Sequence, residues 1–169
     1  MAFGIPKMFA GFLLLLNFCL YVIMASIAGW ALNKAIDHDY TTGPGGIPSG
    51  FPISSVIFPM GNEATGFLVI FALIAGVVGA GSCFTGPHHL RSWSAESLAT
   101  AASSAMTAWA LTLLAMGLAC KEIHMHHRNA KLKTLELLTI ILSGTQFLYM
   151  MVIHAGGRHL TTARADNEK

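Results

Sequence analysis

The chain has 169 residues, enough for one domain, and 54% of them are hydrophobic while only 11% are charged. Because soluble domains carry about 25% charged residues, this composition indicates a membrane protein, with the lipid bilayer as its first partner. The formal net charge of +2 is small and the basic residues are scattered, so no nucleic-acid partner is expected.

Four apolar segments follow in chain order, at residues 8–33, 66–84, 96–120 and 135–155. Each is long enough to cross about 30 Å of hydrocarbon as a helix, which takes roughly 18 residues. We therefore predict an all-α fold, a four-helix transmembrane bundle that forms a single integral membrane domain over residues 1–169. A Gly- and Pro-rich loop separates the first two helices, a short turn at 85–94 joins the next two, and a polar tail occupies 156–169.

The first apolar segment has an alternative interpretation as a cleavable signal peptide, because Lys7 precedes it and residues 26–28 offer small side chains for cleavage. However, the apolar run continues past the usual 7–15 residues of a signal-peptide core. It ends in Trp30 and Lys34, a pair typical of the membrane–water interface. These features favour a transmembrane helix.

The orientation of the bundle is left open by the sequence. Four spans place the N-terminus, the 85–94 turn and the tail on one side, and the loops at 33–65 and 121–134 on the other. Lys and Arg divide equally between the two sides, so the positive-inside rule does not choose. The long Gly/Pro loop, with Lys34 alone, favours termini inside, and the basic loop at 121–134 favours the reverse.

The stretch KEIHMHHRNAKLK at 121–133 combines clustered histidines with basic residues. Its histidines include no pair at the helical i, i+4 spacing of a zinc site, so no metal is expected, and no other cofactor either. The juxtamembrane position instead predicts that Lys121, Arg128, Lys131 and Lys133 face the lipid headgroups.

Small residues recur at helical spacing inside the membrane. The third helix carries them at Ala101, Ala105, Ala108, Thr112, Ala115 and Ala119. The second helix has Ala72-x-x-x-Gly76, and the first has Ala25-x-x-x-Gly29. Because apolar surface gains little from leaving lipid, membrane helices associate through such close backbone approach. The pattern predicts a tightly packed bundle.

The fourth helix has a polar face that runs through Glu136, Thr139, Ser143, Gln146, Met150 and His154. Lipid does not tolerate such a face, so it must point into the bundle or into a partner, and Asn17 of the first helix is the candidate to meet it. One interpretation is hydrogen bonding that holds the helices together. The other is a polar path for a solute or proton, with Asn17, Ser143, Gln146 and His154 as candidates and Arg91 near the interface.

Long blocks of the chain also resemble a known family. SWSAESLATAASSAMTAWALTLLAMGLACKEI and LELLTIILSGTQFLYMMVIHAG are similar to the abscisic-acid-induced wheat plasma-membrane protein family (AWPM-like) of plants, and the resemblance covers residues 12–156. It implies a small four-span plasma-membrane protein of the response to abscisic acid, dehydration, salt and cold, and uptake of abscisic acid into cells. It brings no catalytic or binding residues with it.

The residues themselves constrain that implied activity. Abscisic acid is a monocarboxylic acid on an apolar ring, yet no Lys or Arg lies in the middle of a span, and no inverted repeat or broken helix is evident. A carrier of this size is therefore expected to act as a homo-oligomer or within a larger membrane complex. No enzyme motif is present, so an enzyme is not expected. The alternative function is a non-transporting protein that organises the membrane or acts as a scaffold in stress tolerance.

Overall fold

The computed structural model describes residues 4–41, 63–92, 94–123 and 130–167. These residues form four helices and no strand: α1 Gly4–Thr41, α2 Glu63–Ser92, α3 Ala95–Ile123 and α4 Ala130–Asn167. Each helix contains a stretch that is long and apolar enough to cross a membrane. The predicted all-α class with four membrane-spanning helices is confirmed.

The helices are longer than the apolar segments that predicted them. The predicted turn at 85–94 is wrong for most of its length, because α2 continues through Pro87 to Ser92. A proline removes one helical hydrogen bond, a loss that membrane helices tolerate when neighbouring groups satisfy the freed carbonyl. Likewise α4 continues to Asn167, so most of the polar tail extends the last helix.

The turn between α2 and α3 is set by a helix cap. The backbone N–H of Ser97 donates to Oγ of Ser94 at 3.2 Å, and the backbone N–H of Ser94 donates to Oγ of Ser97 at 3.1 Å. This reciprocal pair satisfies two amides that would otherwise lack partners at the start of α3. The cap at Ser94 therefore fixes the point at which α3 begins.

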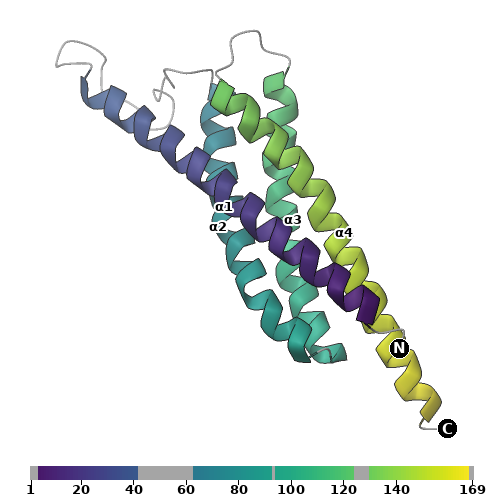
Figure 1. The fold of residues 1–169 in the computed structure, drawn as a ribbon. Coiled ribbons are helices and arrows are strands. Elements are labelled where there is room, and N and C mark those ends of the chain that lie inside the picture. The colour runs from purple at the N-terminus through teal and green to yellow at the C-terminus, as the bar shows by residue number, and fades with distance from the viewer. Residues whose placement is uncertain (1–3, 42–62, 93, 124–129, 168–169) are drawn as a thin grey trace.

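The four helices form a ring in which α1 packs on α2 and α4, and α3 packs on the same two neighbours. Figure 1 shows α2 and α3 side by side, with α1 crossing the bundle at a steep tilt and α4 extending beyond it at its C-terminal end. The two ends of the described chain lie at the same end of the bundle, as an even number of spans requires.

Close packing depends on small residues, as the sequence predicted. All six positions of the α3 stripe are buried, from Ala101 to Ala119. An added Cβ at Gly76 of α2 would lie only 2.9 Å from the Cβ of Ala25, and at Gly79 it would run into the ring of Tyr21. Only glycine at these two positions lets α1 lie so close to α2.

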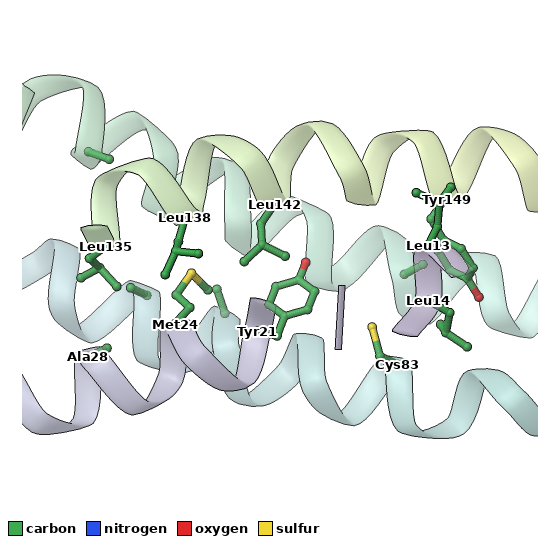
Figure 2. Close-up of a cluster of buried hydrophobic side chains, with 14 of the residues drawn as sticks. Leu13, Leu14, Tyr21, Met24, Ala28, Cys83, Leu135, Leu138, Leu142 and Tyr149 are labelled. Atoms are coloured by element: carbon green, nitrogen blue, oxygen red, sulfur yellow. The ribbon is translucent and has the colours of Figure 1, made fainter. Parts of the chain in front are cut away.

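Leucines and a few larger side chains fill the contact between α1 and α4. Figure 2 shows Leu138 and Leu142 of α4 facing Met24 and Tyr21 of α1. By contrast, many large apolar side chains point outward, including Phe84, which is 77% exposed. A soluble protein would not expose apolar surface on this scale, so the outer surface is suited to lipid.

Candidate functional site

Two amide side chains meet in the middle of the bundle. Nδ2 of Asn17 donates to Oε1 of Gln146 at 2.9 Å, and Nε2 of Gln146 donates to the carbonyl oxygen of Ala105 at 3.4 Å. Asn17 and Gln146 are both fully buried. The predicted contact between Asn17 and the polar face of the fourth helix is therefore present, and it links α1, α4 and α3 in one chain of hydrogen bonds.

The amide of Asn17 retains an unused acceptor. Its Oδ1 is buried and has no hydrogen-bond partner among the described residues. A buried carbonyl without a donor costs roughly 1–3 kcal/mol, so this atom favours any ligand that can present an O–H or N–H to it.

A second hydrogen bond joins α1 to α3 one turn along α1. The hydroxyl oxygens of Tyr21 and Thr112 are 3.0 Å apart, and the Thr112 hydroxyl also donates to the carbonyl of Ala108 at 2.8 Å. Because each hydroxyl has a single proton, Tyr21 is the donor to Thr112. The sequence did not single out Tyr21. Its position four residues after Asn17 could have indicated that it lies on the same inward face of the helix.

Two buried carboxyl groups lie at one end of the bundle. Glu122 of α3 accepts a hydrogen bond from the Thr65 hydroxyl of α2 at 2.9 Å, and Glu136 belongs to the first turns of α4. Both glutamates are only 3% exposed. The sequence placed Glu136 on the polar face but missed Glu122 and Thr65, because α2 and α3 bring these two together only in the folded bundle.

The buried polar residues occupy one half of the bundle, and we call them the buried polar column: Asn17, Thr65, Thr112, Glu122, Glu136, Thr139 and Gln146. From Glu136 to Gln146 the column extends about 15 Å along α4, roughly half the thickness of a hydrocarbon core. Beyond Gln146 the core is closed by larger, mainly apolar side chains, among them Leu13, Leu14 and Tyr149 (Figure 2). The column is therefore one-sided.

The other predicted path residues lie apart from the amide pair. Ser143 sits at the contact between α3 and α4, where its hydroxyl donates to the carbonyl of Ile140 at 2.8 Å and its own carbonyl accepts the indole N–H of Trp109 at 3.1 Å. His154 is exposed and its ring lies against the carbonyl of Met150. Arg91 is exposed near the end of α2.

Three of the four residues that were predicted to face the lipid headgroups lie within the described ranges. Lys121, Lys131 and Lys133 are exposed at the same end of the bundle as Glu122 and Glu136, whereas Arg128 and the histidines of this loop lie outside the described residues. Within the described ranges, no three His, Cys, Asp or Glu residues come together as a metal site.

Four lipid-compatible helices around a buried polar column define a multi-pass α-helical membrane protein. Residues 15–156 match the AWPM-19-like family. The chain is also 43% identical over 164 residues to a protein described as membrane protein PM19L from rice, Oryza sativa subsp. japonica, covering 95% of this chain and 87% of the relative. The chain belongs to the AWPM-19-like family, as the sequence resemblance indicated. No solved structure matches it.

Proposed function

We propose that this protein resides in the plant plasma membrane and carries abscisic acid into cells during the response to dehydration, cold and salt. The buried polar column supports this proposal, because it leads from one end of the bundle to an amide pair at mid-depth. Intramembrane polar groups are costly, so a column of them commonly marks a route for a polar solute.

The chemistry of the column favours the neutral form of the acid. A bare carboxylate in a low-dielectric interior needs a cation, and the column contains no Lys or Arg. Its outer end carries Glu122 and Glu136 instead, which would repel an anion if ionised. A protonated carboxyl group offers one donor and one acceptor, so it can donate to Oδ1 of Asn17, the atom without a partner among the described residues.

Passage across the whole membrane requires the apolar layer around Leu13 and Leu14 to separate. A single four-helix bundle offers few elements that could move past one another. We therefore place the carrier in a homo-oligomer or a larger membrane complex, where neighbouring chains stabilise the separated state.

Uptake of labelled abscisic acid by liposomes that contain only the purified protein tests the proposal. If the carrier transports the neutral acid, its rate depends on the concentration of protonated acid, and so does the rate of passive permeation. The ratio of protein-dependent uptake to background uptake should therefore stay constant as pH rises. A ratio that rises with pH would indicate the anion as the transported species. No excess uptake at any pH would reject the carrier.

The residue-specific arm uses Gln146→Leu, which keeps a similar volume but removes the amide. We expect protein-dependent uptake per folded molecule to be abolished, because the deepest polar contact of the column is lost. Phe147→Leu is the matched control, since this neighbouring side chain is exposed on the outside of the bundle. Unchanged uptake in Gln146→Leu would remove this residue from the path.

A second candidate function is a non-transporting protein that organises the membrane or scaffolds partners under stress. It is favoured by the fact that the amides of Asn17 and Gln146 bond to each other, as structural hydrogen bonds between membrane helices do. If this is the function, the native protein gives no uptake above background. Gln146→Leu then lowers only the free energy of unfolding, by about 0.6–2 kcal/mol.

A further inference from the structure

Two lysines from different helices converge on one indole ring. Nζ of Lys131, in the first turn of α4, lies 3.3 Å from the ring centroid of Trp30, and Nζ of Lys34, one turn after Trp30 on α1, lies 5.4 Å from it. Both distances fall within the range of a cation–π contact, about 6 Å. The ring thus gathers positive charge at the contact between α1 and α4.

This arrangement leaves two like charges close together. Because both nitrogens lie near the same centroid, they are less than about 10 Å apart, the Debye length at 0.1 M salt. Among the residues whose side chains the structure describes (7–36, 65–89 and 130–158 hold those nearest the site), no carboxylate forms an ion pair with either lysine. An anion between or above them would offset the repulsion.

The surroundings indicate which anion fits. Trp30 is 37% exposed, near the end of the membrane-spanning stretch of α1, where headgroup phosphates lie in a bilayer. Ile27 and Ile23, three and seven residues earlier, continue the same face of the helix towards the membrane centre, and Ile23 is exposed. The surface therefore offers cations at headgroup depth and an apolar track below them.

We propose that Trp30, Lys34 and Lys131 form a binding site for the headgroup of an anionic phospholipid, with one acyl chain along Ile27 and Ile23. The lipid bridges α1 and α4, which pack on each other less extensively than the other neighbouring pairs of the ring. The proposed site is more specific than a basic loop that attracts anionic lipid diffusely. It requires the indole ring of Trp30 and the charge of Lys34 on α1, as well as a lysine of α4. It does not depend on transport.

The test measures lipid preference in phosphatidylcholine vesicles that hold the full-length protein and a trace of spin-labelled lipid. The readout is the immobilised fraction of labelled phosphatidylglycerol relative to labelled phosphatidylcholine. We expect Lys34→Gln and Lys131→Gln each to lower this preference about fivefold, which corresponds to about 1 kcal/mol per charge. Trp30→Leu should lower it as well, although no charge changes, because the lysines lose the ring that holds them together.

Lys133→Gln is the matched control, because this lysine is exposed on the same turn of α4 and has no contact with Trp30 among the described residues. Because Lys133 is one of the predicted headgroup-facing residues, its charge contributes diffuse attraction, and its replacement should lower the preference by clearly less than that of Lys131 does. Equal effects of Lys133→Gln and Lys131→Gln, or no effect of Trp30→Leu, would show diffuse attraction and overturn the site. Displacement of the labelled lipid by millimolar inorganic phosphate would also overturn it, since the site would then hold a free anion. Thermal melting of each variant in pure phosphatidylcholine establishes that it is folded.

Discussion

The amide pair shows how single residues set both the packing and the chemistry of this bundle. Asn17 and Gln146 each have more hydrogen-bonding groups than the other can satisfy, so one bond at 2.9 Å joins the helices while Oδ1 of Asn17 is left without a partner among the described residues. A purely structural pair would gain from satisfying that oxygen. The unused acceptor is therefore the feature that most favours a ligand at this depth.

The bond itself predicts non-additive mutations. Asn17→Leu and Gln146→Leu should each lower the free energy of unfolding by about 0.6–2 kcal/mol, since each leaves the other amide buried without its partner. The double variant should cost less than the sum of the two, because it removes both members of the pair. Unfolding in mixed micelles measures this, with Ser143→Ala as the milder control. Strict additivity would mean that the two amides do not interact.

The glycines of α2 predict a contrast within one helix. Gly79→Ala should lower the free energy of unfolding by about 1–3 kcal/mol, because the new methyl group meets the ring of Tyr21, which the hydrogen bond to Thr112 holds in place. Gly81→Ala is the control, with nothing within 4 Å of the added atom. It should be neutral or slightly stabilising, since alanine favours helix over glycine. Equal melting temperatures for the two variants would contradict the close approach of α1 to α2.

At the scale of helices, one indole makes two of the contacts between α3 and α4. The Trp109 N–H donates to the Ser143 carbonyl, and the Trp109 ring lies 5.6 Å from that of Phe147. Trp109→Phe keeps an aromatic contact but loses the donor, so we expect a loss of about 0.5–1.5 kcal/mol in thermal or denaturant unfolding. Phe147→Leu keeps the hydrogen bond and tests the ring contact alone. A larger loss in Phe147→Leu would show that stacking, and not the N–H, holds these helices together.

Sequence patterns foresaw the inward faces of these helices better than their ends. The spacing of Ala101 to Ala119 identified the buried side of α3, because small residues at helical period have one structural use in lipid. Polarity, however, marks where a helix leaves the membrane and not where it stops, so the extension of α4 to Asn167 was missed. The same reason applies to α2, which passes Pro87 and ends at Ser92.

The candidate site could be predicted only in part. Asn17 was expected to meet the polar face that includes Gln146, because a polar group deep in an apolar span needs a partner, but the sequence did not choose Gln146 within that face. Tyr21 with Thr112 was not, because a tyrosine in an apolar run is indistinguishable from an ordinary core aromatic. Thr65 with Glu122 depends on which helix ends meet, and that is decided by the packing of the whole ring.

At the scale of the whole molecule, the polar column occupies only one half of the bundle. The orientation of the bundle in the membrane therefore decides which side of the membrane the polar half faces. The buried polar residues reach the end of the bundle that holds Thr65, Glu122 and Glu136, whereas apolar side chains such as Leu13, Leu14 and Ile153 fill the other end. A solute that entered from the polar end would meet polar groups first. The direction of any uptake therefore depends on which end faces the cell exterior.

Cysteine-accessibility mapping measures this orientation directly. In a background where Cys19, Cys83 and Cys120 are replaced by alanine, single cysteines are introduced by Ser92→Cys, Ala130→Cys and Thr162→Cys, all at exposed positions near helix ends. A membrane-impermeant maleimide added to sealed vesicles should label the first and third from one side and the second from the other, because α2 ends and α4 begins at opposite ends of the bundle (Figure 1).

The result also decides the sidedness of the proposed carrier. Labelling of Ala130→Cys from outside would place the polar end of the column towards the exterior, as the proposed uptake into the cell requires. Labelling of Ala130→Cys only from inside would show that the polar end of the column faces the cytosol. This conformation of the protein would then correspond to the inward-facing state of a carrier, from which solute is released. Labelling of Ser92→Cys and Ala130→Cys from the same side would contradict the four-span arrangement itself, because an odd number of crossings cannot return the chain to the face it left.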